Sequence, residues 1–454
     1  MRIHLGALGC RLNEAELERW ANDFGAAGHA LAEAPADADV MVLNTCAVTR
    51  EAVAKSRRRL QRLQRENPAA KLVVSGCYSE LEPAGALASL GVDLVVPNAH
   101  KDRLVPLVRA AFDDPSMPAA ATLPSEQSLF RRNRHRAFVK VQDGCRYRCA
   151  FCIVTVARGA ERSRPVADLV GEVQSLVAGG VREVVLTGVH VGGYGSDLGT
   201  DLAALVRALL ADTDVPRLRF ASVEPWDLSD DFLSLFTDPR VQPHMHLPLQ
   251  SGSDAVLRRM SRRCRSGDFA RLVSELRETV PGFGVTTDII AGFPGETEAE
   301  WQETLRFVES QRFSHVHAFT YSEREGTRAA SMPGAVPVPR RRERTRELAA
   351  LAARLREEAL REAVGGVAEV LWEGGRCIDG ADGSGRGAAE ADGARFANGR
   401  TPGDGEGRWR NAGYTPNYLR VVTVGPHDLS NRIDAIRLDR VEDGVLIGTP
   451  ALSS

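Results

Sequence analysis

The sequence predicts an α/β protein with three parts: an N-terminal open parallel α/β domain, a central partial (β/α)6 barrel and a small C-terminal β-barrel. Three observations support this. Short apolar runs alternate with amphipathic stretches over the first hundred residues, and the same alternation recurs six times in the central region. The C-terminal section changes to strand-like pieces around a Gly- and Asp-rich stretch. A chain of 454 residues also exceeds one ordinary hydrophobic core.

Residues 1–112 are expected to form the first domain. Asn13 opens an expected helix whose apolar residues recur at helical spacing, and a second helix is expected over 51–65, before Asn67-Pro68. The expected strands are 2–8, 40–43, 72–75 and 92–96. Strands that alternate with helices indicate a parallel sheet.

Residues 113–130 are rich in Pro, Ala and Ser, which is typical of a linker. The central domain is expected over 131–362, beginning with a basic run and ending with a charged helix over about 340–362. Its expected strands are 137–142, 183–187, 217–222, 244–249, 284–290 and 315–320. Six β/α units favour a partial barrel, with a doubly wound sheet as the alternative.

The third domain is expected over 363–450. Residues 374–407 are rich in Gly, Asp and Ala and lack apolar periodicity, so they are expected to be a flexible insertion. The expected strands around it are 367–372, 418–424, 432–438 and 444–447.

The composition and hydropathy argue against a protein that binds nucleic acid through a uniformly basic surface, and against a secreted or membrane protein. A net charge of −2 gives no global basic field, so any nucleic-acid contact must use local patches. No signal-peptide pattern opens the chain, and no apolar run approaches the roughly 20 residues that span a bilayer. We therefore expect a cytoplasmic protein without membrane contact. Eight cysteines in that compartment favour metal or redox chemistry over disulfides.

Three of these cysteines lie close together, at Cys145, Cys149 and Cys152, after the first central strand. Structural zinc needs a fourth ligand, and none is close by. A [4Fe–4S] cluster on three thiolates keeps one iron open for a substrate. The alternative is three buried or zinc-bound cysteines.

The CxxxCxxC spacing, with aromatic Phe151 before the last cysteine, resembles the radical S-adenosylmethionine superfamily. The resemblance implies that the open iron chelates S-adenosylmethionine and that the reduced cluster cleaves it to a 5′-deoxyadenosyl radical. Further residues are expected at the carboxyl ends of strands, where barrel enzymes bind ligands. The expected cofactor-binding residues are Phe151, Gly188, Glu224, Gln250 and Gly292.

A second set, Cys10, Cys46 and Cys77, is spread over the first domain, but each cysteine ends an expected strand. Parallel strands share their carboxyl edge, so the three thiols could converge on one ion or cluster. The alternative is three buried cysteines that behave as small hydrophobes.

Resemblance extends this interpretation. Leu8-Gly9-Cys10-x-x-Asn13-x-x-Glu16, Asn44-Thr45-Cys46 and Ser75-Gly76-Cys77-Tyr78 are similar to the N-terminal domain of the methylthiotransferases. The resemblance implies an auxiliary [4Fe–4S] cluster on the three cysteines, which carries the sulfur to be inserted. The segment with Gly413-Tyr414-Thr415-x-Asn417-Tyr418 resembles a TRAM domain, a small RNA-binding β-barrel.

The family implies the substrate class. The segments 44–49 and 188–195 are most like the subgroup that acts at C2 of N6-threonylcarbamoyladenosine at position 37 of tRNA, beside the anticodon. Isopentenyladenosine in tRNA and a ribosomal-protein aspartate are the alternatives, and a non-catalytic zinc- and RNA-binding protein is an alternative of another class. The expected partners are tRNA, a flavodoxin- or ferredoxin-like electron donor and a sulfur source, and the protein is expected to be a monomer.

The RNA contacts are expected at local basic and aromatic residues, because the C-terminal section is not basic. The expected residues are Arg131, Arg132, Tyr414, Tyr418 and Arg420. The basic run 340–346 could also meet phosphates, or it could be a solvated helix face. Cys264 and Cys377 have no partners by spacing and are expected to be bystanders.

Overall fold

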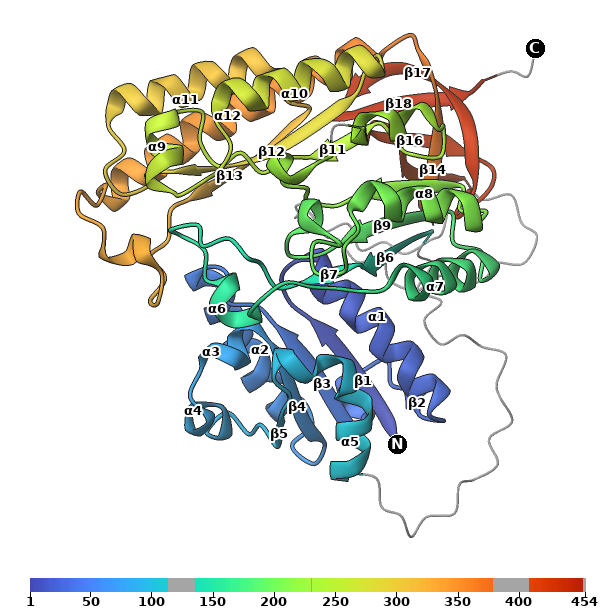
Figure 1. Cartoon of the computed structure of the whole chain (residues 1–454). Coiled ribbons are helices and arrows are strands. Elements are labelled where there is room, and N and C mark those ends of the chain that lie inside the picture. Colours follow the sequence, from blue (N-terminus) through green and yellow to red (C-terminus); the bar gives the residue numbers. More distant parts are fainter. Residues whose placement is uncertain (113–134, 230, 379–407, 452–454) are drawn as a thin grey trace.

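The computed structural model describes residues 1–112, 135–229, 231–378 and 408–451 (Figure 1). The linker 113–130, Arg131, Arg132 and most of the Gly-rich stretch lie outside the described residues. Within the described ranges, no helix combines the length and the hydropathy needed to cross a bilayer.

The first domain is a five-stranded parallel sheet in the order β2-β1-β3-β4-β5. The strands are β1 (Arg2–Ala7), β2 (Ala30–Leu31), β3 (Val40–Thr45), β4 (Lys71–Gly76) and β5 (Leu94–Val95). The helices are α1 (Arg11–Ala26), α2 (Arg50–Glu66), α3 (Cys77–Leu81), α4 (Ala84–Ala88) and α5 (Leu104–Phe112). All six residues of β3 are buried, because α1 and α5 cover one face of the sheet and α2 and α3 cover the other.

The central domain is the expected partial barrel. Its strands are β6 (Arg136–Lys140), β9 (Glu183–Thr187), β10 (Arg217–Phe220), β11 (His244–His246), β12 (Gly284–Ala291) and β13 (His315–Thr320). They form two parallel three-stranded sheets, β10-β9-β6 and β11-β12-β13, which parallel bridges such as Ser222–His246 join. Across the described ranges no pairing joins β6 to β13, so the barrel is open there. Helix α1 of the first domain contacts β6 beside this opening.

Helices cover the outer side of the barrel, as α10–α12 do above β12 and β13 in Figure 1. These helices are α7 (Val166–Ala178), α8 (Leu202–Asp212), α9 (Asp254–Arg259), α10 (Ser266–Thr279), α11 (Glu298–Gln311) and α12 (Val338–Ala363). A short antiparallel pair, β7 (Gln142–Asp143) and β8 (Arg162–Ser163), encloses the loop of the clustered cysteines together with α6 (Val154–Arg158).

The third domain is a closed five-stranded barrel in the order β14-β15-β16-β18-β17. The strands are β14 (Val367–Cys377), β15 (Trp409–Tyr414), β16 (Arg420–Gly425), β17 (Ile433–Glu442) and β18 (Val445–Pro450). Two expectations are corrected. Residues 374–377 belong to β14, where they pair with β15, and are not part of an insertion; β15 itself was not expected. The predicted fold class is confirmed for all three parts.

Candidate functional site

The clustered cysteines lie in a tightly folded loop above the barrel. Gly144, with φ of +71°, admits no side chain, because a Cβ there would lie 1.9 Å from the Ala160 carbonyl oxygen. Cys145 then donates its N–H to the Gly159 carbonyl oxygen, and Cys152 donates to that of Cys149 at 3.0 Å. The backbone therefore folds back on itself and leaves the thiols partly exposed.

The three sulfurs of this loop are near enough to influence one another. Burial raises the pKa of Cys145 to about 12 and that of Cys152 to about 11, and charge on Cys149 would raise both further. Two donors point at the sulfurs: the Tyr147 N–H lies 3.4 Å from Cys145 Sγ, and Arg262 Nη1 lies 3.7 Å from Cys149 Sγ. Three thiols that share donors of this kind fit an iron–sulfur cluster, whose sulfur ligands accept hydrogen bonds.

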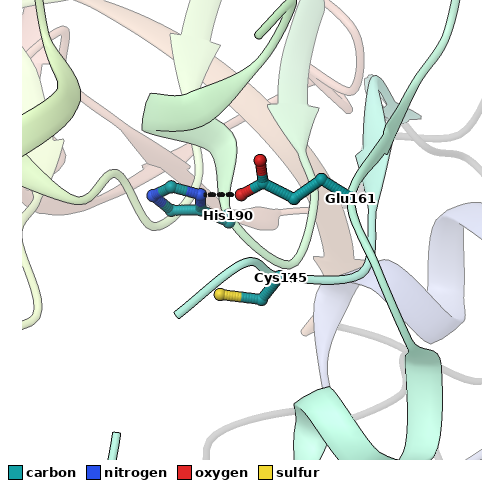
Figure 2. A group of neighbouring side chains, drawn as sticks. All are labelled: Cys145, Glu161 and His190. Carbon is teal, nitrogen blue, oxygen red and sulfur yellow. Dashed lines mark hydrogen bonds and ion pairs between the residues drawn. The ribbon is translucent and has the colours of Figure 1, made fainter. Parts of the chain in front are cut away.

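A buried histidine lies next to this loop. Figure 2 shows the Glu161–His190 ion pair beside Cys145, and the ligand atoms of the three residues lie within 4.8 Å of one another. The other ring nitrogen of His190 lies 2.8 Å from Asp227 Oδ2. Burial lowers the pKa of His190, but Asp227, Glu224 and Glu161 together raise it above its usual value. Because both ring nitrogens are engaged by carboxylates, His190 is a poor fourth ligand for zinc.

Two of the expected cofactor-binding residues lie at the carboxyl ends of β9 and β10. Gly188 lies against β7, where a Cβ would be 3.0 Å from the Gln142 carbonyl oxygen. Glu224 is largely buried, and burial raises its pKa. Its Oε2 has no hydrogen-bond partner among the described residues. An acceptor of this kind fits the ammonium group of a bound amino acid such as the methionine part of S-adenosylmethionine.

Of the other three expected residues, Gln250 and Gly292 follow β11 and β12, and Phe151 lies in the cysteine loop. Phe151 packs against a buried cluster that includes Ala150 and Phe293. Gln250 adopts φ of +81° and donates its N–H to the Asp288 carbonyl oxygen at 2.8 Å. At Gly292 a Cβ would lie 2.4 Å from Arg341 Cγ, so Arg341 accounts for the glycine without a ligand. Their contact with S-adenosylmethionine stays a prediction.

The second thiol set lies at one edge of the first domain. Cys10 follows β1, Cys46 follows β3 and Cys77 begins α3 after β4. Gly9 contacts Cys46 so closely that a Cβ would lie 2.7 Å from Cys46 Sγ. Burial raises the pKa of Cys46 to about 11, and charge on Cys10 and Cys77 would raise it further. The structure thus brings together three thiols that are 67 positions apart from first to last, with Cys10 exposed.

One segment, residues 321–330 after β13, contacts both loops. On the side of the second set, Arg50 donates to the Glu323 carbonyl oxygen at 3.1 Å, and charge on Cys46 acts on Arg324. On the side of the first set, Ala329 donates its N–H to the Ala150 carbonyl oxygen at 2.8 Å. The two thiol sets therefore lie on either side of the carboxyl end of β13.

A buried ion network, which the sequence did not predict, joins the first domain to the barrel. Glu16 of α1 accepts from Arg158 at 3.0 Å and from Lys101 at 2.5 Å, and each of these three side chains is at most 3 % exposed. Lys140 of β6 lies 3.0 Å from Glu16, and Arg158 also pairs with Asp143 at 3.1 Å.

This network lies against the second thiol set. Asn13 accepts from Arg158 at 2.9 Å and donates to the carbonyl oxygens of Leu8 and Thr45, which precede two of the cysteines. The available sequence signal was the spacing Asn13-x-x-Glu16, which places both polar side chains on one face of α1.

The expected RNA-contacting tyrosines lie inside an interface. Tyr414 and Tyr418 stack on each other at 4.6 Å, and the Tyr418 ring lies 4.8 Å from that of His244 at the start of β11. Arg136 and Arg219 lie over the Tyr418 ring, at 5.2 and 4.8 Å. The two tyrosine rings thus pack against residues at the amino ends of the barrel strands. These residues cover the ring faces on which a base would stack. Arg420, at the start of β16, is partly exposed.

The basic run 340–346 also differs from expectation. Arg341 and Arg344 are buried, where Arg344 pairs with Glu296 at 2.8 Å and Arg341 pairs with Glu323 at 2.5 Å. Arg340 pairs with Glu298 at 2.6 Å. Arg341 and Arg344 thus attach α12 to the loops after β12 and β13, whereas Arg342 and Arg346 are exposed on the solvent side of the helix.

Comparison with known proteins agrees with these features. Residues 139–308 match the radical SAM superfamily model, and residues 2–97 match that of uncharacterized protein family UPF0004. The chain is 34% identical to threonylcarbamoyladenosine tRNA methylthiotransferase MtaB of Bacillus subtilis, over 95% of this chain and 92% of that protein. It is 36% identical to tRNA-2-methylthio-N(6)-dimethylallyladenosine synthase of Acidothermus cellulolyticus, over 98% and 93%.

Among solved structures, the chain resembles the radical S-adenosylmethionine methyltransferase TsrM from Kitasatospora setae, solved with cobalamin and a [4Fe–4S] cluster bound. The TM-score is 0.54 at 17% identity, over 72% of this chain and 77% of that one. At this identity the likeness supports the fold alone.

Proposed function

Because the chain belongs to the radical S-adenosylmethionine tRNA methylthiotransferases, we propose that it inserts a methylthio group at C2 of N6-threonylcarbamoyladenosine at position 37 of tRNA. The product is 2-methylthio-N6-threonylcarbamoyladenosine. The observation that carries the proposal is the pair of three-thiol sets on either side of the segment after β13, since sulfur insertion at an unactivated C–H bond needs a radical source and a sulfur source at one place.

The family uses S-adenosylmethionine and [4Fe–4S] clusters, which supply the radical and the sulfur when bound. In our proposal Cys145, Cys149 and Cys152 hold the first cluster. Glu224 orients S-adenosylmethionine through its carboxylate oxygen Oε2, which accepts no hydrogen bond from the described residues.

Cys10, Cys46 and Cys77 hold the auxiliary cluster in this proposal, facing the first across the end of β13. The Glu16–Arg158 network keeps the two thiol sets at a constant separation, because it attaches α1 directly to α6. A fixed separation matters since the radical formed beside one cluster and the sulfur held by the other would have to reach the same carbon atom.

The threonylcarbamoyl substrate is supported by the segments 44–49 and 188–195 and by the relative from B. subtilis, whereas the relative from A. cellulolyticus is named for a dimethylallyl substrate. Nucleoside mass spectrometry of tRNA from a deletion strain separates the two. We expect loss of 2-methylthio-N6-threonylcarbamoyladenosine alone. Loss of the methylthio-isopentenyl nucleoside would reassign the substrate, and an unchanged tRNA profile would reject a tRNA substrate.

The cluster content is tested on protein reconstituted anaerobically. Two clusters require about eight irons per chain. About four irons would remove the auxiliary cluster from the proposal, and zinc without iron would favour a non-catalytic zinc protein. We further propose that the enzyme acts as a cytoplasmic monomer and takes electrons from a flavodoxin- or ferredoxin-like donor.

A further inference from the structure

The inner face of β11–β13 carries aromatic and ionisable side chains that the proposed chemistry does not use. We call them the inner-wall group. It consists of His246, Asp288, His317 and Phe319. Alternate residues of these strands, among them Val285, Ile289 and Val316, face the helices and pack in the core. The inner-wall group therefore faces the opposite way, toward the inside of the barrel.

The side chains of the group contact one another in a row. Asp288 pairs with His317, and Ile290 pairs with Phe319, in the register of β12 and β13. The His317 ring lies 5.5 Å from that of His246 and 6.5 Å from that of Phe319. Phe319 is 43% exposed, an unusual state for an apolar side chain on the inside of a barrel.

The position of the group relative to the two thiol sets is suitable for a substrate. Ile290 packs against the buried cluster that includes Ala150 of the first cysteine loop, and Asp288 lies two residues before Ile290 on the same face of β12, about 7 Å along the strand. Phe319 lies just before the segment that contacts the second set. On the other side of the opening, Arg11, which follows Cys10, lies 5.1 Å over the Phe138 ring of β6.

The chemistry of the group favours a base with a polar substituent. Enzymes that modify a base take it out of its stack and hold it by stacking and by hydrogen bonds. Phe319 and the imidazoles offer stacking surfaces. Asp288 Oδ1 lies 3.2 Å from His246 Nε2, and the imidazole of His317 adds a further polar group beside this carboxylate. An apolar substituent here would desolvate these groups without replacing their hydrogen bonds.

We propose that the inner-wall group is the binding surface for the target adenosine and selects a polar N6 substituent over an apolar one. Phe319 stacks on the base, and His317 donates a hydrogen bond to the substituent. This inference rests on the proposed function and adds the residues that distinguish its substrate.

The test measures binding to the reconstituted full-length protein, independently of turnover. Three anticodon stem-loops of one sequence carry adenosine, isopentenyladenosine or N6-threonylcarbamoyladenosine at the target position, and anaerobic fluorescence anisotropy gives each dissociation constant. We expect the wild type to prefer the threonylcarbamoyl stem-loop. His317→Ala should reduce that preference about ten-fold and leave binding of the unmodified stem-loop unchanged. Phe319→Ala should weaken all three about ten-fold.

Two further variants serve as controls, one for the aromatic ring and one for a substitution outside the group. Phe319→Leu keeps the apolar volume without the ring and should behave as Phe319→Ala, and Val367→Ala, which truncates a 62% exposed side chain of β14, should bind as the wild type. If His317→Ala kept the wild-type preference and Phe319→Ala kept the wild-type affinities, the inference would be overturned, while the wild-type preference would still support the proposed substrate. A wild type without preference would instead count against the proposed substrate.

A divalent cation is the alternative ligand for the inner-wall group, and metal analysis of the same proteins distinguishes it from the adenosine. The ligand atoms of His246, Asp288 and His317 lie within 4.8 Å of one another, so a divalent cation could bind there. A stoichiometric divalent metal that is present in the wild type beyond the cluster iron, and absent from His317→Ala, would overturn the role of the group in substrate binding.

Discussion

Single residues distinguish the two thiol sets. Cys10 is exposed, whereas Cys46 and Cys77 are buried, and the thiols around Cys145 are partly exposed. Thiols that burial keeps protonated become good ligands only when a metal displaces their protons. Substitution of any cysteine within one set is therefore expected to remove the function of that set alone. The function of the other set should be kept.

Alanine at Cys145 should abolish formation of 5′-deoxyadenosine, because the cluster that cleaves S-adenosylmethionine is lost. Alanine at Cys10 should preserve that cleavage and stop methylthio insertion. Liquid chromatography of 5′-deoxyadenosine and mass spectrometry of the tRNA measure the two outcomes. Cys377→Ala, at the end of β14, is the matched control and should retain both. If Cys10→Ala still formed methylthiolated tRNA, Cys10 would not be an auxiliary ligand.

Glu16 is the residue on which the buried network depends. Glu16→Gln should reduce the free energy of unfolding by about 3–5 kcal/mol, because Arg158 and Lys101 would stay buried without their counter-charge. Urea denaturation of the full chain measures the change. Glu14→Gln, two residues away in an Arg11 pair that is partly exposed, should cost less than about 1 kcal/mol. Equal costs for the two variants would show that the network adds no stability.

Among the elements, the start of β9 connects the barrel to the third domain. Glu183 pairs with Arg136 at 2.5 Å and with Arg219 at 3.0 Å, and both arginines contact Tyr418. Burial raises the pKa of Glu183, but the two arginines offset this and hold that pKa well below its usual value. The carboxylate is thus charged in the fold at every pH at which the protein is handled.

This depressed pKa predicts the sign of an acid effect. A carboxyl whose pKa is lower in the folded state stabilises the fold above its unfolded pKa of about 4.3, and the contribution is lost as the pH falls toward the folded value. Glu183→Gln should therefore be less stable than the wild type at pH 7, and the difference should narrow below about pH 4. Thermal unfolding between pH 7 and pH 3 measures it. If the stability difference between Glu183→Gln and the wild type did not change with pH, it would contradict a lowered pKa of Glu183 in the folded protein.

Over the whole molecule, the barrel lies between two other domains with different contacts. The first domain meets it through charged side chains near the carboxyl ends of its strands, and the third meets it through aromatic rings at the amino ends. The thiol sets and the tyrosine stack therefore lie at opposite ends of the barrel.

The charged interface predicts a cooperative unit. The first domain and the barrel should unfold in one transition, and Arg158→Met should separate them into two, because Arg158 joins Glu16 of α1 to Asp143 of the barrel. Differential scanning calorimetry of the full chain shows the number of transitions. The control Arg162→Met replaces an exposed arginine of β8 and should keep one transition. A single transition in Arg158→Met would assign the coupling to other contacts.

Prediction from sequence succeeded where periodicity was strong and local. β9 and β13 have the bounds expected for them, since β9 is a short apolar run that is buried throughout and β13 begins with alternating polar and apolar residues. The pair β7 and β8 was not expected because two-residue strands have no measurable period. β15 was not expected either, because its Trp409–Tyr414 sequence follows a Gly-rich stretch and pairs with a strand distant in sequence. RNA contact of Tyr414 and Tyr418 stays a prediction, and no local pattern indicated that their rings pack against Arg136 and His244.

The sequence by itself determined the order of strands and helices and the two sets of cysteines, because periodicity and spacing are local properties of the chain. Only the tertiary structure decided that Glu16 meets Arg158, 142 residues away, and that Tyr418 packs against His244. It also decided that the inner-wall group forms one surface. Such contacts depend on how separate elements pack, and no local pattern records that, since a buried charge is tolerated only where the fold supplies its partner.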